Sequence, residues 1–397
     1  MAVVAVAVIA VAVIAVALAA LSAGVLISVA GVAGATGAAH PAGGPGTGGA
    51  GVPGSPAPSL SAAQLAGQRI IYAYSGLTPP PQLLALIRAG EAAGVIFFGP
   101  NVASSEQLNG VVDELQRANA ATPVHAPLLL MADQEGGLVR RLPGAPALSE
   151  QRIGASPDGL SLATAAGAGA GRNLAAAGLN VNLAPVLDVA RSPGGFDGQY
   201  QRSYGASASR DARLGDAFIA ALQSTAVAAT AKHFPGLGAA SRAQNTDLRP
   251  VTVNLTLHTL RTVDEAPFQA AFHAGVKLVM LSWAVYPALD PKLPAGLSKR
   301  VIGAELRGRL GFRGVTVTDS LSAGALSAFG SVGARGVLAA DAGADLLVCA
   351  APHPDENTPK EGAAVMNALA SALAHRPSLR TTSEQAVDRI IALRRGL

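Results

Sequence analysis

The stretch Ala231-Lys232-His233-Phe234-Pro235-Gly236-Leu237-Gly238 decides the fold, because it ends an apolar run with two polar side chains and a sharp turn. The run itself, Ala226–Ala231, is typical of a parallel strand that is buried on both faces. A Lys-His pair at the exit of such a strand lies where the βα-loops of a barrel build active sites. For this octapeptide alone, the alternative is a surface turn with a solvated lysine.

The same alternation extends over most of the chain, since short apolar runs alternate with longer amphipathic stretches, as in βα units around a parallel sheet. Eight runs predict a closed (β/α)₈ barrel: Ile70–Ala73, Gly94–Phe98, Leu128–Ala132, Val181–Val186, Ala226–Ala231, Lys277–Leu281, Gly314–Val317 and Ala344–Ala350. Helices are expected over Pro81–Ala93, Ser105–Ala121, Gly159–Ala177, Ala208–Ser224, Thr259–Ala274, Ile302–Leu310, Val332–Ala342 and Ser383–Arg395. The alternative is a doubly wound open sheet, but Tyr74-Ser75-Gly76-Leu77-Thr78 is not the glycine-rich phosphate loop that usually follows its first strand.

Polar side chains stand at the carboxyl ends of four predicted strands. In a closed barrel these ends converge on one rim, so residues far apart in sequence share one pocket. A lone aspartate at a strand end is commonly a helix N-cap, but three carboxylates with a Lys-His pair at one rim are hard to explain as caps. The strand-end residues are Asp133, Asp188, Lys232, His233 and Asp319.

The beginning of the chain differs in composition from the rest. No charged residue occurs from Ala2 to Val32, a run longer than the roughly 20 residues that a helix needs to cross a bilayer. We expect residues 1–32 to be a signal peptide or a membrane anchor, and the absence of a basic residue after Met1 keeps the uncleaved anchor open. Residues 33–58, rich in Gly, Ala, Pro and Ser, predict a flexible linker before a barrel over residues 59–397.

Composition and charge exclude some classes of protein. Apolar residues make up 50% of the 397, enough for a large core. The net charge of +4 comes from dispersed arginines rather than a basic stripe, which gives no argument for nucleic-acid binding. Cys349, the only cysteine, is expected to be a buried strand residue, and a single cysteine excludes a disulfide within the chain.

Five motifs in this order resemble glycoside hydrolase family 3. They are Asp133-Gln134-Glu135-Gly136-Gly137, Asn182-Leu183-Ala184-Pro185-Val186-Leu187-Asp188, Arg202-Ser203-Tyr204-Gly205, Lys232-His233-Phe234-Pro235-Gly236 and Thr318-Asp319-Ser320-Leu321. The resemblance covers residues 63–397 and is strongest to the single-barrel β-N-acetylhexosaminidase branch. It implies a barrel that cleaves β-linked sugars with retention of configuration, without a metal or a cofactor.

Retaining hydrolysis usually needs a carboxylate nucleophile and a second group that first gives and then takes a proton. By the resemblance, Asp319 matches the nucleophile, and the β-branched run before it would hold it in place. Its alternative role is the N-cap of a helix that begins near Ser322. The resemblance further implies that the hydroxyls of the terminal sugar are held by Asp133, Arg202, Lys232 and His233.

Neighbouring residues are expected to have secondary roles. Asp188 is expected to bind sugar or to support the residues that do, and Arg140 and Arg141 to extend the rim. Glu135 is expected to be structural, accepting hydrogen bonds from backbone donors near the two glycines that follow it; the alternative is a direct role in catalysis.

The loop after Lys232-His233 departs from the family pattern. The hexosaminidase branch usually carries an Asp-Ser-His tripeptide there, whose histidine is the acid/base, but this loop holds no histidine. Asn245-Thr246-Asp247 stands near the same place, so Asp247 is the candidate acid/base. A carboxyl serves this role if burial or a neighbouring carboxylate such as Asp319 raises its pKa; otherwise Asp247 is an ordinary loop residue.

Trp283 marks a second departure, because relatives often carry a histidine at this position after the sixth strand. An exposed tryptophan at the rim would stack on a sugar and form a wall of the substrate site. The alternative is a core tryptophan packed under a helix.

These inferences predict a secreted or membrane-anchored, monomeric glycosidase that removes a terminal β-linked sugar from a carbohydrate substrate. The first expectation is β-N-acetylglucosamine from cell-wall fragments or chitin-type oligomers. A β-glucosidase is the enzymatic alternative. The other is a non-catalytic sugar-binding or scaffold protein that has lost its proton donor.

Overall fold

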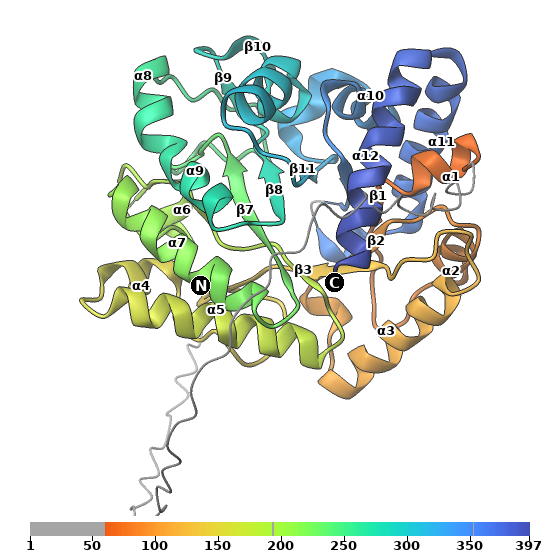
Figure 1. Ribbon diagram of the computed structural model, residues 1–397, viewed down its shortest axis with the longest axis horizontal. Coiled ribbons are helices and arrows are strands. Elements are labelled where there is room, and N and C mark those ends of the chain that lie inside the picture. The colour runs from red at the N-terminus through yellow and green to blue at the C-terminus, as the bar shows by residue number, and fades with distance from the viewer. Residues whose placement is uncertain (1–59, 193, 352) are drawn as a thin grey trace, which may run out of the picture. The chain divides into compact units, whose positions relative to one another are not determined.

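The computed structural model describes residues 60–192, 194–351 and 353–397 (Figure 1). The predicted signal peptide or anchor at 1–32 and the predicted linker at 33–58 lie outside the described residues. Within the described part of the chain, no helix is both long and apolar enough to span a membrane.

Eight parallel strands close a barrel, which confirms the predicted (β/α)₈ architecture and excludes the open sheet. Strand β1 pairs with β2 on one side and with β12 on the other, and this second pairing closes the ring. In order around the barrel the strands are β1 (Ile70–Tyr72), β2 (Gly94–Phe97), β3 (Leu129–Ala132), β6 (Val181–Asn182), β7 (Ala228–Phe234), β8 (Leu278–Leu281), β11 (Val315–Ser320) and β12 (Leu346–Cys349). Each predicted run overlaps one of them.

Three strands end three or more residues from their predicted ends: β6 at Asn182, β7 at Phe234 and β11 at Ser320. The fourth predicted run breaks up after Asn182, because Pro185 has no N–H for the ladder; Val186 then forms only an isolated bridge with Lys232. Strand β7 instead continues to Phe234, so Lys232 and His233 belong to the strand itself.

Helices surround the barrel as predicted, with differences in detail. The longer ones are α2 (Pro81–Arg88), α3 (Ser105–Asn119), α5 (Gly159–Ala176), α7 (Ala208–Gln223), α9 (Ala266–His273), α10 (Val332–Ala342), α11 (Pro359–His375) and α12 (Pro377–Arg395). Helix α11 was not predicted from the sequence, and α12 begins six residues earlier than the predicted last helix. Arg300–Arg309 is a π-helix. Short elements are α1 (Ala62–Gly67), α4 (Glu150–Ala155), α6 (Phe196–Gln199), α8 (Leu257–Thr259) and the hairpins β4 (Gln134–Gly136) with β5 (Val139–Arg140) and β9 (Val285–Tyr286) with β10 (Asp290–Pro294).

The core has two parts because side chains alternate along each strand. Ile71 belongs to the cluster formed by strand residues inside the barrel, whereas Ile70 and Tyr72 pack in the larger cluster with the helices. Cys349 is buried and free, as predicted.

Helix α12 closes the amino-terminal end of the barrel. Its Ile390 joins the interior cluster, and the fully buried Arg394 donates to the carbonyl oxygens of Pro127 and Ala126 at 2.6 and 2.8 Å. These carbonyls precede β3, so the guanidinium satisfies backbone acceptors where the strands begin. Helix α12 does not cover the opposite end of the barrel, where the strands end, so that end can hold a functional site.

Candidate active site

A cavity of about 590 Å³ lies at the carboxyl ends of the strands. The site residues that line it come from β7, β11 and the segments that follow β3, α6 and β7. The structure thus brings together six of the predicted residues: Asp133, Arg202, Lys232, His233, Asp247 and Asp319. Asp188 and Trp283, also predicted as substrate-binding, do not line the cavity.

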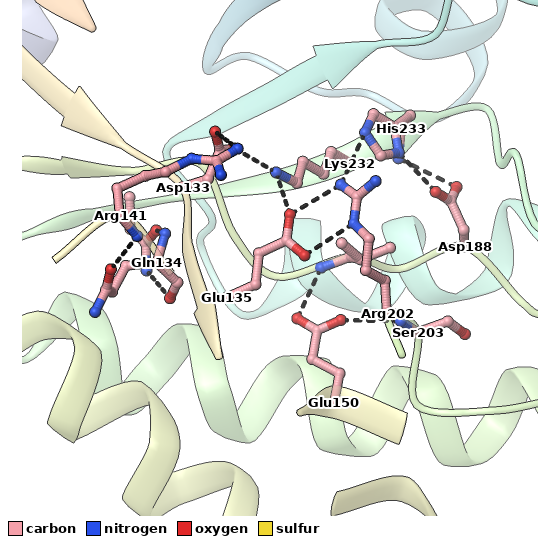
Figure 2. Close-up of polar contacts among 12 residues, drawn as sticks. Asp133, Gln134, Glu135, Arg141, Glu150, Asp188, Arg202, Ser203, Lys232 and His233 are labelled. Atoms are coloured by element: carbon pink, nitrogen blue, oxygen red, sulfur yellow. Dashed lines mark hydrogen bonds and ion pairs between the residues drawn. The ribbon is translucent and has the colours of Figure 1, made fainter. Parts of the chain in front are cut away.

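Lys232 is the centre of an ionic cluster in this cavity (Figure 2). Its Nζ lies 2.8 Å from Oδ1 of Asp133 and 2.6 Å from Oε1 of Glu135. Arg202 holds the same Glu135 through two parallel hydrogen bonds, Nε to Oε2 at 2.9 Å and Nη2 to Oε1 at 2.8 Å. Arg141 approaches Asp133 at 3.3 Å from the other side and also lines the cavity.

The expectation for Glu135 is therefore only half right. The residue is 2% exposed and is held by two charged side chains, not by backbone donors near Gly136 and Gly137. The sequence could not show this, because both partners follow in other motifs. Glu135 lines the cavity between Lys232 and Arg202, so it fixes the two cations that face the ligand space.

The cluster is ionised in the folded protein. Burial alone would raise the pKa of Asp133, but Lys232 and Arg141 hold it below its usual range. Burial also opposes the ionisation of Glu135. The charges of Arg202 and Lys232 outweigh the effect of burial, so the pKa of Glu135 is lowered. Burial would lower the pKa of Lys232, but Asp133 and Glu135 raise it. The cavity thus offers fixed donors and acceptors of the kind that bind neighbouring hydroxyls.

Asp188 orients His233 from behind. Its Oδ2 lies 2.7 Å from Nδ1 of the imidazole, and its Oδ1 accepts hydrogen bonds from the backbone N–H groups of His233 and Leu237 at 3.1 and 2.6 Å. Asp188 is fully buried, so it acts as a support of the site and not as a wall of the cavity. The far ring nitrogen, Nε2, faces Nη2 of Arg202 at 3.4 Å.

Glu150, the first residue of α4, supports the site but was not predicted from the sequence. Its Oε1 accepts from the backbone N–H of Val186 at 3.0 Å, and its Oε2 from that of Ser203 at 3.2 Å. The side chain therefore ties the exit of β6 to the segment that carries Arg202. Burial and the nearby Glu135 raise its pKa well above the usual range. Nothing in the sequence distinguishes this glutamate from a solvated one at the start of a helix.

Asp319 lies near the end of β11, after the β-branched run Val315–Thr318. Its Oδ1 accepts from the backbone N–H of Ser320 at 2.7 Å. No α-helix begins near Ser322 in this described segment; a 3₁₀-helix over Gly324–Phe329 follows instead, so the N-cap alternative is wrong. The carboxylate lines the cavity.

The loop that carries Asp247 is fastened next to Asp319. The carbonyl of Asp247 accepts from the N–H of Gly324 at 2.7 Å, and that of Thr246 from the N–H of Ala325 at 2.9 Å. Asp247 is open to solvent at the cavity, yet the surrounding loops bury it enough to raise its pKa, and Asp319 raises it further, to about 6. The two carboxyls thus share one cavity and differ in environment.

Trp283 is not a wall of the cavity, which corrects the expectation. The residue is 1% exposed, its Nε1 donates to the carbonyl of Ser320 at 2.8 Å, and its ring packs so closely on Gly296 that a Cβ there would lie 2.4 Å from Cζ3. An exposed tryptophan would lose this packing, so the core alternative holds. Arg140 also lies away from the cavity and binds the carbonyls of Gly137 and Gly144.

Comparison with known proteins assigns the family. A model of the glycosyl hydrolase family 3 N-terminal domain matches residues 75–393. The chain belongs to glycosyl hydrolase family 3. As a member of this family it is a glycosidase, an enzyme that hydrolyses O-glycosyl bonds of carbohydrate substrates, and the predicted resemblance is confirmed.

Relatives of this family 3 chain include an uncharacterized secreted glycosyl hydrolase of Arthroderma benhamiae, 42% identical over 86% of this chain and 95% of that protein. A β-hexosaminidase of Stenotrophomonas maltophilia is 37% identical over 66% of this chain and 77% of its own length. Among solved structures, a family 3 β-N-acetylglucosaminidase from Paenibacillus superposes with a TM-score of 0.79 at 35% identity, over 85% of this chain and 63% of that one. A β-N-acetylhexosaminidase from Beutenbergia cavernae gives 0.75 at 32% identity, over 85% and 99%.

Proposed function

We propose that this family 3 glycosidase is a retaining β-N-acetylglucosaminidase that removes the terminal sugar of a β-linked oligosaccharide. The observation that carries the proposal is the pair Asp319 and Asp247, two carboxyls that line one cavity together with a charged cluster of the kind that binds hydroxyls. The names of the Paenibacillus, Beutenbergia and Stenotrophomonas relatives support the choice of sugar.

The terminal sugar binds against the charged cluster. Asp133 accepts hydrogen bonds from neighbouring hydroxyls, and Lys232, Arg202 and His233 donate to others. Lys232 and Arg202 are pinned by Glu135, so little side-chain entropy is lost on binding. This binding away from the bond that breaks orients the ring and supplies energy for its distortion.

The reaction takes two displacements at the anomeric carbon C1. In the first, Asp319 attacks C1, the bond from C1 to the leaving oxygen breaks, and Asp247 gives its proton to that oxygen. In the second, a water attacks C1, Asp247 takes the water's proton, and the ester to Asp319 breaks. A pKa of about 6 suits Asp247 for both roles, because the group still carries a proton to give in weakly acidic solution and, once ionised, can take one from the attacking water.

The substrate and the place of action form the finer part of the proposal. Asp247 stands where the hexosaminidase pattern has a histidine, so a β-glucosidase is the second candidate. We further propose that the enzyme acts outside the cytoplasm as a monomer, exported or anchored by residues 1–32 and spaced by residues 33–58 from a barrel that starts at residue 59. The charge-free start of the chain and the secreted Arthroderma relative support this location.

A panel of 4-nitrophenyl β-glycosides tests the proposal. We expect turnover of the N-acetylglucosaminide, and proton NMR of the first product should show the β-anomer. Preferred turnover of the glucoside instead selects the β-glucosidase. An α-anomer as first product contradicts retention, and no turnover of any glycoside contradicts the enzymatic assignment of the site.

A further inference from the structure

One side of the cavity carries an exposed aromatic side chain that the reaction described above does not use. Tyr200, which follows α6 directly, lines the cavity and is 40% exposed. Phe196 at the start of α6 also lines it and is almost fully buried. The two rings meet edge to face, with their centroids 5.8 Å apart and their planes at 76°. Phe196 therefore packs against Tyr200, and the Tyr200 side chain remains partly open to the cavity.

Helix α6 is fastened to the loop that carries Asp247. The N–H of Phe196 donates to the carbonyl of Ala240 at 3.1 Å, and the N–H of Arg191 to that of Gly238 at 3.0 Å. At the other end of the helix, the N–H of Arg202 donates to the carbonyl of Asp197 at 3.0 Å. The helix that carries the aromatic pair is thus hydrogen-bonded both to the loop of the candidate acid/base and to the segment of Arg202.

This placement decides which part of a substrate the pair would contact. The terminal sugar binds to the charged cluster around Lys232, and Asp247 gives its proton to the leaving oxygen. The sugar attached to that oxygen therefore emerges beside the loop of Asp247, where α6 is fastened. Pyranose rings present apolar C–H faces that stack on aromatic rings, whereas a fluoride or a simple alcohol has no such face.

We propose that Tyr200, supported by Phe196, forms a binding subsite for the second sugar of the substrate, the one that departs with the leaving oxygen. This inference rests on the proposed function and deepens it, because it assigns a residue of this chain to the second pyranose ring of the oligosaccharide. Tyr200 is then a specificity-determining residue, and Phe196 a positioning residue that acts through it.

The test compares a substrate that has a second ring with one that lacks it. Chitobiose and β-N-acetylglucosaminyl fluoride share the terminal sugar, but only chitobiose reaches the subsite. In Tyr200→Ala the ratio of kcat/KM for chitobiose to that for the fluoride should fall about ten-fold, the size of one lost aromatic stacking contact. Tyr200→Phe keeps the ring and should keep the ratio. Leu160→Ala, which removes a 58% exposed side chain outside the cavity lining, is the matched control and should also keep it.

An unchanged ratio in Tyr200→Ala overturns the subsite, and so does an equal fall for both substrates with a normal melting temperature. Failure of the proposed function is seen separately, as absence of turnover of both substrates by the wild type. In that case calorimetry measures the binding of N-acetylglucosamine and of chitobiose. The subsite requires that the wild type binds chitobiose more tightly and that Tyr200→Ala loses this difference. Equal affinities of the wild type for the two sugars contradict the subsite.

Discussion

Lys232 and Glu135, which come from different strand exits of the barrel, form a buried ion pair in which Nζ lies 2.6 Å from Oε1. Both side chains are 2% exposed. Since Asp133 and Arg202 hold the same two residues, the pair fixes the charged side of the cavity before any sugar arrives. Its removal therefore affects stability and binding together.

Lys232→Met should lower the free energy of unfolding by about 3–5 kcal/mol, because it leaves buried carboxylates with one cation fewer. It should also weaken sugar binding. Urea titration measures the first effect and calorimetry the second. Lys299→Met is the matched control: its ion pair with Asp341 is formed by a 68% exposed lysine and should contribute less than about 1 kcal/mol. Equal losses in the two variants contradict the role of the buried pair.

Asp247→Ala should slow substrates with poor leaving groups about 10²-fold to 10⁴-fold and activated substrates much less, because only poor leaving groups require protonation. Azide should restore turnover of activated substrates by attacking the glycosyl-enzyme without base assistance. Ser241→Ala, in the same loop, serves as the control. Equal slowing of good and poor leaving groups, with no effect of azide, makes Asp247 an ordinary loop residue.

The pH profile gives an independent reading of Asp247. An acid must carry its proton in the free enzyme, so kcat/KM for poor leaving groups should fall as pH rises through about 6, the pKa to which burial and Asp319 raise this carboxyl. In Asp247→Ala this fall should disappear. If kcat/KM of the variant still falls as pH rises through about 6, another group supplies the proton to the leaving oxygen.

Asp211 on α7 should make folding stability depend on pH. Both carboxylate oxygens are buried and find no hydrogen-bond partner among the described residues, and burial followed by repulsion from Asp188 raises the pKa to about 8. Between its ordinary pKa and about 8, the folded state holds a proton that the unfolded state has lost. This contribution to stability therefore falls as pH rises, by up to about 1.4 kcal/mol per pH unit.

Asp211→Asn removes this titration, so the variant should gain stability over the wild type between pH 5 and pH 7.5 in urea titrations. Asp158→Asn, at an exposed carboxylate, should show no such gain. A difference between wild type and Asp211→Asn that is the same at both pH values contradicts the assignment.

A chain that begins at Ser59 should be soluble and folded. Helix α1 retains its own capping box, in which Ser61 and Gln64 bind each other's backbone N–H groups, so the start of this helix is capped by residues that the shortened chain keeps. Circular dichroism and a cooperative melt check this. Aggregation of the shortened chain, with a well-folded full chain in detergent, places the domain boundary elsewhere.

The barrel could be predicted because each strand is a short apolar run with a turn after it, and this pattern is local in sequence. The differences lie where long-range packing decides. The run from Val181 to Val186 breaks at a proline, and α11 was missed because its many alanines give a weak apolar stripe.

The site could be predicted in part, because strand exits reveal which residues gather at one rim but not how they pair. Lys232 and His233 were found this way. The buried contacts of Glu135 and Glu150, and the packing of Trp283 on Gly296, depend on residues distant in sequence. The exposure of Tyr200 likewise has no local sequence signal.

Asp319→Asn should abolish turnover while the melting temperature and sugar binding remain close to those of the wild type. The amide keeps the shape of the side chain, and its carbonyl oxygen still accepts from Ser320, but it is a poor nucleophile. A variant that retains most of the wild-type activity contradicts the assignment of Asp319.

The most direct measurement is mass spectrometry of the enzyme after reaction with a 5-fluoro-N-acetylglucosaminyl fluoride. The ring fluorine slows both displacements. Because fluoride is a good leaving group, the first displacement is faster than the second, so a glycosyl-enzyme accumulates. We expect one added sugar unit on the peptide that contains Asp319, and none in Asp319→Asn. A sugar attached to another residue, or turnover of the wild type with inversion and no adduct, would contradict it.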